Sequence, residues 1–245
     1  MTNHDVQAAA ESLYIEPEHS EQEREWPALE LLDVFKIYRS GPVETVALRG
    51  LDMRVEPGEL VAVLGPSGCG KSTMLALAAG LDTPSAGELR VFGRSLTRAG
   101  EAELAAYRAR ELAIVFQSDN LWPALSAQEN VTISLGLAGR EASQGEAVAA
   151  LEAFGLAGRR THRAAALSGG EQQRVAIAAA AARNARLVLA DEPTGELDRQ
   201  NEQIVLDALA ALRRDHGSTV VVVTHSERVA TAADRVIELR DGRVA

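Results

Sequence analysis

The stretch GPSGCGKST, Gly65 to Thr73, restricts the fold of this chain more than any other segment. It directly follows the apolar run ELVAVL, Glu59 to Leu64, whose continuous hydrophobicity is typical of a parallel strand buried on both faces. The stretch fits the pattern G-x-x-x-x-G-K-[ST], in which a glycine-rich loop joins a strand to a helix. An α/β fold built on a parallel sheet is therefore predicted.

The residue types in this loop suit phosphate binding. Gly65, Gly68 and Gly70 let backbone amides curl around phosphate oxygens without interference from a Cβ. The Lys71 ammonium can reach β- and γ-phosphate oxygens, and the Ser72 hydroxyl can ligate Mg²⁺. An ordinary glycine turn between a strand and a helix is the alternative, but the complete pattern favours a phosphate-binding loop, called the P-loop below.

A second apolar run ends in two acidic residues. The segment RLVLADE, Arg186 to Glu192, reads as a buried strand with Asp191 and Glu192 at its carboxyl end. Open α/β sheets bind ligands at the carboxyl ends of their parallel strands. The two carboxylates are therefore expected near the P-loop.

A second glycine pair opens a helix-forming run in ALSGGEQQRVAIAAA, residues 165 to 179. A helix N-terminus presents unpaired N–H groups and the positive end of the backbone dipole, so this start can also hold phosphate. The chain thus carries two anion-seeking helix starts, separated by about a hundred residues.

The composition fits a single domain with a subdomain, because 245 residues with 46% apolar content can bury a sizeable core. The sequence contains no run of about 18 apolar residues, the length needed to cross a bilayer. Its N-terminus also lacks the basic segment followed by an apolar one that marks a secretory signal. A cytosolic location is expected. The single cysteine, Cys69, excludes a disulfide framework and a multi-cysteine zinc site, and a redox switch there is the less favoured alternative.

The charge argues against a nucleic-acid partner. The formal net charge is −10, whereas binding to a phosphate backbone needs a basic stripe. Residues 1 to 28 carry seven acidic side chains against Arg24 alone, which puts −6 in this tail and −4 in the remainder. Low hydrophobicity and self-repulsion predict a disordered tail, and an acidic docking arm is the alternative.

Strand and helix patterns alternate from Leu29 onward. The expected strands are 30–39 and 45–60, which form an antiparallel start, then 87–93, 112–117, 186–191 and 218–225. Helices are expected from about Lys71, over much of 126–161 and over about 201–214, and a hairpin turned by Asp241 and Gly242 closes the chain.

The order of these motifs resembles that of the nucleotide-binding subunit of ABC transporters, over nearly all of residues 29–245. LSGGEQQR, residues 167–174, placed just before LVLADEPTGELD, residues 187–198, resembles the family's signature motif followed by Walker B and the D-loop. The resemblance implies an α/β P-loop NTPase (RecA-like) core with an antiparallel β subdomain. It also implies a helical signature subdomain at about 118–183, inserted in an ABC ATPase domain of residues 29–245 that follows the acidic tail 1–28.

The resemblance supplies roles in ATP and Mg²⁺ chemistry. The implied catalytic residues are Glu192 as general base, His225 as the switch histidine, Lys71 and Gln117. The implied Mg²⁺ ligands are Ser72, Gln117 and, through water, Asp191. The implied ATP contacts are Tyr38, which stacks on adenine, and Gly65, Pro66, Ser67, Gly68, Cys69, Gly70, Lys71, Ser72, Thr73, Ser168, Gly169, Gly170, Glu171 and Asp198.

Several of these assignments have a structural alternative. Tyr38 can pack in the core, a strand-end glutamine such as Gln117 is usually structural, and His225 can cap the helix that follows it. Two solvated carboxylates in a loop are the alternative for Asp191 and Glu192.

The resemblance implies that two subunits pair head to tail, so that residues 168–170 of one chain cap the γ-phosphate held in the P-loop of the other. The second subunit is another copy or a paralogous ATPase. PTGELD, GLDTPSAGE and VFQSDNLWPALSAQENV look most like the branch that serves macrolide export and lipoprotein release, although the family usually has Asn where Glu196 stands.

We therefore expect an ATP-hydrolysing subunit that drives a separate integral membrane permease for export, extrusion or mechanotransmission, at the cytoplasmic face of the membrane. The permease is expected to dock near Gln117–Leu125, where Leu121 and Trp122 supply apolar surface; burial of Trp122 in the helical subdomain is the alternative. An ABC importer is the nearest alternative function. A soluble non-transport ABC ATPase is disfavoured, because only about 50 residues separate Gln117 from Leu167.

Overall fold

The computed structural model describes residues 26–41, 43–140 and 144–245. The expected disorder of the acidic tail concerns mainly residues 1–25, which lie outside the described residues. Ala28, placed in the tail by the sequence, is instead fully buried, and its amide donates to the Val55 carbonyl at 2.8 Å. The packed chain therefore begins before Leu29, because this backbone contact extends the first strand's pairing toward the N-terminus.

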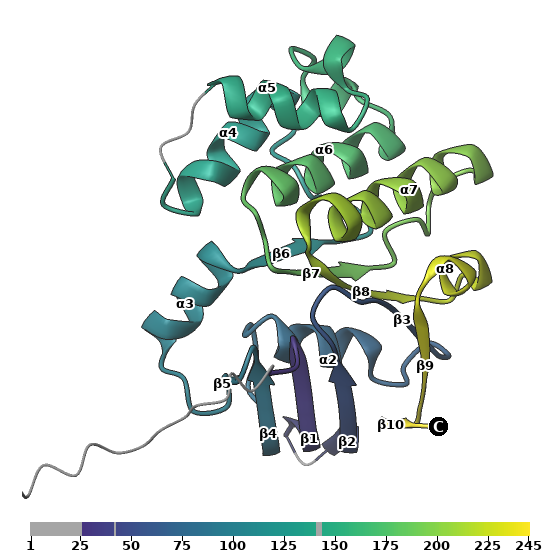
Figure 1. Cartoon of the computed structure of the whole chain (residues 1–245). Coiled ribbons are helices and arrows are strands. Elements are labelled where there is room, and N and C mark those ends of the chain that lie inside the picture. Colours follow the sequence, from purple (N-terminus) through teal and green to yellow (C-terminus); the bar gives the residue numbers. More distant parts are fainter. Residues whose placement is uncertain (1–25, 42, 141–143) are drawn as a thin grey trace, which may run out of the picture.

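Strands and helices alternate through most of the described chain (Figure 1). The strands are β1 (Leu29–Ser40), β2 (Val43–Val55), β3 (Leu60–Leu64), β4 (Ala86–Val91), β5 (Arg94–Ser95), β6 (Leu112–Val115), β7 (Leu187–Asp191), β8 (Thr219–Thr224), β9 (Arg235–Arg240) and β10 (Arg243–Val244). The α-helices are α2 (Lys71–Ala78), α3 (Glu101–Arg110), α4 (Ala127–Leu137), α5 (Gln144–Ala153), α6 (Gly169–Ala182), α7 (Arg199–His216) and α8 (Glu227–Ala232), with 3₁₀ turns at Ala157–Arg159 and Ala164–Ala166.

The central sheet has the order β10-β9-β3-β8-β7-β6, and all neighbours except β10 and β9 are parallel. Alternate residues of its three middle strands enter two different apolar clusters. One cluster takes Leu60, Ala62, Val188, Ala190, Val220 and Val222, and the other takes Val61, Val63, Leu187, Leu189, Val221 and Val223. Both faces are therefore buried, which explains why these strands read as unbroken apolar runs.

A second, antiparallel sheet has the order β2-β1-β4-β5. Helix α2 lies between this sheet and the central one and contacts strands of both (Figure 1). The P-loop helix is thereby held from two sides.

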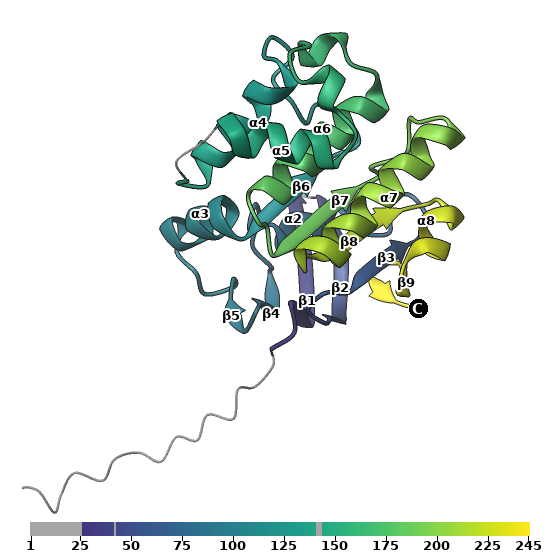
Figure 2. The same cartoon turned by 45° about the horizontal axis from the view of Figure 1, so that its top comes forward.

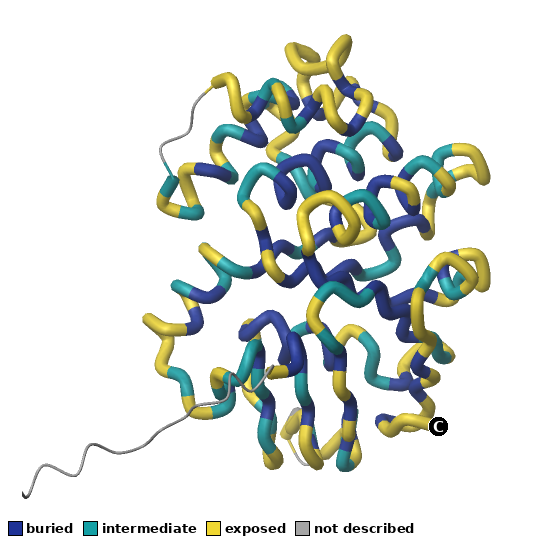
Figure 3. The backbone as a smooth tube through the Cα atoms, in the orientation of Figure 1, coloured by how far each residue is buried: buried dark blue, intermediate teal, exposed yellow. Residues whose placement is uncertain are grey.

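The opposite face of the central sheet carries a helical layer in which α6 packs against α4, α5 and α7 (Figure 2). Helix α6 is rich in alanine, and its inward residues are almost all buried. Small side chains let helices approach closely. Buried residues follow the central strands and α6 on this side, and α2 with the antiparallel sheet on the other (Figure 3).

The predicted α/β class and the closing hairpin, β9 with β10, are confirmed. The helix expected over 201–214 runs instead over Arg199–His216, because Asp198 caps its start and Gly217 takes a left-handed conformation at its end. The helical stretch expected over 126–161 is divided into α4, α5 and a 3₁₀ turn. Helix α3 was not predicted from the sequence, since only Leu104 and Tyr107 form its buried stripe. No helix in the described part of the chain is long and apolar enough to cross a membrane.

Candidate active site

The P-loop joins the end of β3 to the start of α2, and Gly70 occupies the cap position of that helix. Its φ of 107° is a conformation that L side chains rarely adopt, and a Cβ there would lie 2.6 Å from the carbonyl oxygen of Ala47. The Gly70 carbonyl accepts the amide of Met74 at 2.9 Å, which starts the helical ladder. Glycine is therefore required at position 70 by the backbone and by its neighbour.

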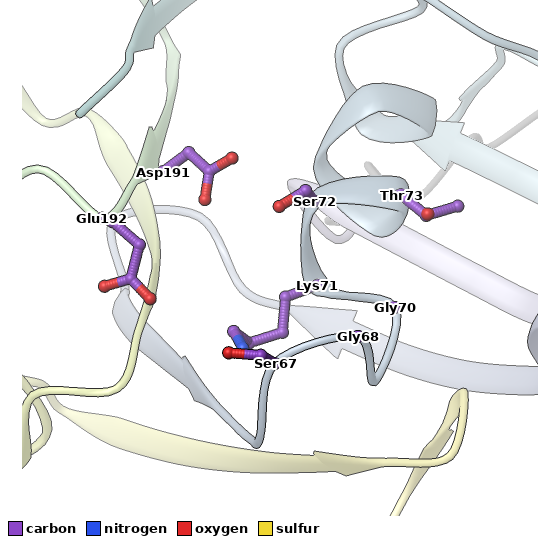
Figure 4. Close-up of a pocket in the computed structure, with 8 residues that line it drawn as sticks. All are labelled: Ser67, Gly68, Gly70, Lys71, Ser72, Thr73, Asp191 and Glu192. Atoms are coloured by element: carbon purple, nitrogen blue, oxygen red, sulfur yellow. The ribbon is translucent and has the colours of Figure 1, made fainter. Parts of the chain in front are cut away.

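A cavity of about 280 Å³ opens beside this loop (Figure 4). It is lined by Ser67, Gly68, Gly70, Lys71, Ser72, Thr73, Asp191 and Glu192. The parallel sheet thus brings the carboxylates at the end of β7 to the P-loop, as the sequence predicts. The volume is just below the range of about 300–1,000 Å³ for small-molecule sites, so it suits a phosphate chain better than a whole nucleotide.

The Lys71 side chain folds back over the P-loop, so that its ammonium contacts backbone at the start of that loop. It donates to the carbonyl oxygens of Gly65 at 2.7 Å and Pro66 at 3.1 Å. A lysine ammonium is a compact charge with three donors and can exchange such partners for phosphate oxygens.

Asp191 and Ser72 face each other across the cavity (Figure 4). Burial raises the pKa of the Asp191 carboxyl above its ordinary value, a hydrogen bond with the Ser72 hydroxyl opposes the rise, and the neighbouring charge of Glu192 adds to it. A hydroxyl and a carboxylate are hard oxygen ligands of the kind that Mg²⁺ prefers. Within the described ranges no cluster of three or more His, Cys, Asp or Glu side chains could hold a metal ion.

Glu192 has an unusual backbone. Its φ of 46° is rare for a residue other than glycine, and it is held by the bond from its amide to the Val223 carbonyl at 2.9 Å. Its side chain contacts His225, whose Nδ1 lies 2.9 Å from Oε1 and whose backbone amide donates to Oε2 at 3.3 Å. Residues 33 positions apart in the sequence are thereby paired beside the P-loop.

Gln117 lies outside the lining of this cavity. Its side-chain Nε2 donates to Oε1 of Glu196 at 3.2 Å. Because a carboxylate only accepts hydrogen bonds, this contact fixes the orientation of the amide and leaves Oε1 of Gln117 as an available acceptor.

The signature segment is not joined to the P-loop within one chain. Ser168 caps α6: its hydroxyl accepts the Glu171 amide at 3.3 Å, and the Glu171 carboxylate accepts the Ser168 amide at 2.9 Å and pairs with Arg159 at 2.7 Å. Among the described residues no hydrogen bond or ion pair links 168–171 to the P-loop, and none of the four lines its cavity.

The glycine pair also has a packing role. A Cβ at Gly170 would lie 2.7 Å from Oδ1 of Asn201, and one at Gly169 would lie 3.2 Å from the Leu197 side chain. Asp198 caps α7 by accepting the amides of Gln200 and Asn201 at 3.0 and 2.9 Å. The starts of α6 and α7 therefore pack side by side in the same chain.

Five predicted nucleotide contacts outside the signature segment do not line the cavity, namely Tyr38, Gly65, Pro66, Cys69 and Asp198. Tyr38 is 42% exposed on β1; its hydroxyl donates to Asp82 at 3.2 Å, and the Lys36 ammonium lies 5.0 Å from its ring centre. The core-packing alternative therefore does not hold for Tyr38. The Cys69 side chain is buried in the apolar cluster below the sheet, so only its backbone can face the loop's interior.

A separate groove follows β6. It is lined by Ala113, Ile114, Asn120, Leu121, Trp122, Asn130, Ser134, Leu137, Ala176, Ala179, Ala180 and Arg183. Trp122 is 50% exposed and Leu137 63% exposed, so the buried alternative for Trp122 is wrong. Leu121 is partly buried against the apolar cluster of the helical layer.

Sequence reasoning missed two residues beside Gln117, namely Asn120 and Gln173. The Gln173 side chain reaches the carbonyls of Phe116 and Gln117, and Asn120 contacts Gln173. The available signal was the position of Gln173 on the otherwise apolar stripe of α6, three residues after Gly170 and four before Ile177.

Comparison with known proteins agrees with this geometry. A family model described as ABC transporter matches residues 48–195, more than half of the chain. The chain is 44% identical over 218 residues to the lipoprotein-releasing system ATP-binding protein LolD of Geobacter metallireducens, which covers 88% of this chain and 97% of that protein. It is 46% identical over 218 residues to the macrolide export ATP-binding/permease protein MacB of Rhodopseudomonas palustris, which covers 88% of this chain but 33% of that protein. The chain therefore spans about a third of the length of that second relative.

Solved structures show the same likeness. The dimeric structure of an ATP-binding cassette in a post-hydrolysis state, bound to ADP and Pi, has a TM-score of 0.81 and 38% identity, covering 88% of this chain and 96% of that one. A second dimeric structure of a bacterial ABC transporter cassette has a TM-score of 0.81 and 39% identity, with the same coverage.

The raised pKa of Asp191 predicts that its ionised carboxylate destabilises the fold when no nucleotide is bound. Because the pKa is higher in the folded state, the free energy of unfolding falls as the pH rises from the ordinary pKa of 3.8 through the folded-state pKa. Asp191→Asn should therefore raise the urea midpoint at neutral pH without nucleotide or Mg²⁺, and the gain should shrink as the pH falls toward 3.8. Asp215→Asn is the matched control, since pairing with Arg214 lowers the pKa of Asp215, so no gain is expected. A gain that is independent of pH would contradict this account.

Proposed function

The chain belongs to the ABC transporter family and is an ATPase, and we propose that two copies pair head to tail and drive a separate membrane subunit of the export type. The observation that carries the proposal is the division of the site. One chain supplies a P-loop cavity with two carboxylates, whereas its signature helix start has no contact with that cavity. A second chain is then needed to complete the site.

Phosphate binding falls to the P-loop. Lys71 exchanges the carbonyls of Gly65 and Pro66 for phosphate oxygens, and the first amides of α2 point at the same anion. Ser72 and, through water, Asp191 would hold Mg²⁺, with the Gln117 amide oxygen as a further ligand. When bound, the ion would neutralise charge that develops on the transferred phosphoryl group.

Glu192 is the proposed general base. Its strained backbone and its contact with His225 hold the carboxylate at the edge of the cavity, where it can accept a proton from the attacking water. The Nδ1 of His225, 2.9 Å from Oε1, orients this carboxylate.

The second copy contributes its signature segment. The hydroxyl of Ser168 and the first amides of α6 then cap the γ-phosphate bound in the facing P-loop. The two solved cassettes with a TM-score of 0.81 are described as dimers, which supports this arrangement. Tyr38, exposed on β1, would stack on the adenine outside the phosphate cavity.

The groove beside β6 is the proposed docking site of the permease. Exposed Trp122 and Leu137 are rimmed by polar side chains, which is typical of a protein interface. The groove includes Asn120, three residues after Gln117, so a docked helix would act next to the proposed Mg²⁺ ligand. Docking would hold the chain at the cytoplasmic face of the membrane.

The export assignment follows the relatives. One similar protein is named for lipoprotein release and another for macrolide export. An importer subunit is the runner-up, since the catalytic residues would be the same in either direction.

Glu192→Gln tests the chemistry. The variant should bind MgATP with unchanged affinity but hydrolyse it at least about a hundredfold more slowly, because the position is kept and the base is lost. Lys71→Ala should instead weaken binding, measured by equilibrium titration with a fluorescent ATP analogue. Exposed Glu227→Gln is the control and should leave turnover unchanged. Turnover of Glu192→Gln within threefold of wild type would rule out Glu192 as the base.

Mixing two inactive variants tests the shared site. A Lys71→Ala chain and a Ser168→Arg chain can form one competent site per heterodimer, so an equal mixture should recover about a quarter of the wild-type rate per chain. Ser126→Arg is the matched control, because Ser126 caps α4 with the same capping box but lies outside the proposed site. A mixture that stays inactive although heterodimers form would contradict independent shared sites.

Trp122→Glu tests the groove. The variant should keep ATP affinity in the isolated chain but lose co-purification with a co-expressed membrane subunit, because a charge would enter an apolar contact. Val43→Glu, a change at a 60% exposed apolar residue of β2, should not affect co-purification. Unchanged binding and stimulation by the membrane subunit would exclude this groove.

A further inference from the structure

Gln173 is a polar residue on a buried helix face. Its side chain is 3% exposed, and its neighbours on the inward stripe of α6 are apolar or glycine. A buried amide costs free energy unless its donors and acceptor are all paired. The partners of Gln173 therefore show what this residue holds.

Both N–H donors of the Gln173 amide and its oxygen are hydrogen-bonded to one short segment. Nε2 donates to the Phe116 carbonyl at 2.8 Å and to the Gln117 carbonyl at 2.7 Å. Oε1 accepts the side-chain amide of Asn120 at 3.1 Å. The helix that begins at the signature serine is thereby bonded to the backbone of Gln117, across 56 positions of sequence.

Asn120 is hydrogen-bonded to the backbone at the start of the same segment. Its Oδ1 accepts the Phe116 amide at 2.8 Å, and its Nδ2 donates to the Phe116 carbonyl at 2.8 Å as well as to Gln173. All four N–H donors and both oxygens of the two amide side chains are hydrogen-bonded, so residues 116–120 are fixed to α6. We call this set of four hydrogen-bonding residues, Phe116, Gln117, Asn120 and Gln173, the amide interlock.

The interlock lies where three parts of the molecule meet. The Gln117 side chain contacts Glu196 in the loop after β7, Ser168 lies five residues before Gln173 on α6, and Asn120 lines the groove with Ala176 of α6. A helix is stiff over such distances. Movement of α6 would therefore carry the Gln117 backbone with it.

We propose that Gln173 and Asn120 are positioning residues, which fix Gln117 to the signature helix so that Gln117 enters the active site only when that helix is correctly placed. The proposal rests on the proposed role of Gln117 in hydrolysis. It assigns the link to two named side chains of this chain, and neither of them touches the P-loop cavity.

The test is a double-mutant cycle in the full chain. Gln173→Leu keeps the side-chain volume but removes the one side-chain donor to the Gln117 carbonyl that the described residues contain. MgATP affinity should stay unchanged while turnover falls about tenfold, since a loosened Gln117 is misplaced for much of the time. In a Gln117→Ala background the same change should lower turnover by less than about twofold, because the two residues act through one step.

The matched control is Gln172→Leu, one position earlier on α6. In the described part of the chain the Gln172 side chain donates one hydrogen bond, to the Leu167 carbonyl at 3.0 Å, and none to the interlock. Any fall in turnover of this variant should be by the same factor in the wild-type and Gln117→Ala backgrounds. Hydrogen exchange at the Phe116 amide should become faster in Gln173→Leu and stay unchanged in Gln172→Leu.

If Gln173→Leu does not fold, Asn120→Asp replaces it, because aspartate keeps the acceptor for the Phe116 amide and loses the donor to Gln173. It should show the same dependence on Gln117. Equal fold losses in the wild-type and Gln117→Ala backgrounds, or a loss of ATP affinity, would overturn the interlock. Unchanged turnover in Gln117→Ala alone would instead refute the role assigned to Gln117 in the proposed function, and the interlock would fall with it.

Discussion

The register of three parallel strands is the constraint on which the site depends. Val63 of β3 pairs with Val223 of β8, and Val223 pairs with Asp191 of β7. Two strand spacings, about 10 Å, therefore separate the strand that feeds the P-loop from the strand that ends in the acidic pair. A shift of one residue would turn the carboxylate of Asp191 to the other face of the sheet. Burial of both faces in separate apolar clusters makes such a shift costly, so the core fixes the distance between the phosphate loop and the acidic residues.

Much of this arrangement could be predicted from the sequence, because it depends on local patterns. The apolar runs before Gly65 and before Asp191 identified two central strands, and the spacing of Gly70, Lys71 and Ser72 identified the loop between strand and helix. The remainder depends on contacts between distant segments. The bonds from Gln173 to residues 116 and 117 follow from the packing of α6 against the end of β6, which no local pattern reveals.

The starts of α6 and α7 are a second case in which local sequence patterns did not reveal a contact between distant segments. From the sequence, Gly169 and Gly170 indicated an anion site. The structure adds that Asn201 of α7 fills the space where a side chain at position 170 would lie. Small residues at this point let two capped helix starts lie together, so the signature serine and the D-loop aspartate keep a fixed relative position within each chain. Glycine at these positions is therefore constrained by the packing of α6 against α7 as well as by the expected phosphate binding.

The contacts of Lys71 bear on discrimination between nucleotides. Its ammonium is already solvated by two carbonyl oxygens of the loop, so an incoming anion must replace good neutral partners rather than satisfy an unpaired charge. The gain from that exchange depends on how much more negative the new partners are. A single phosphate already makes stronger, charge-assisted bonds than a neutral carbonyl does, and a triphosphate places more negative charge near the same ammonium. The exchange at Lys71 therefore favours ligands with a longer phosphate chain over singly charged anions.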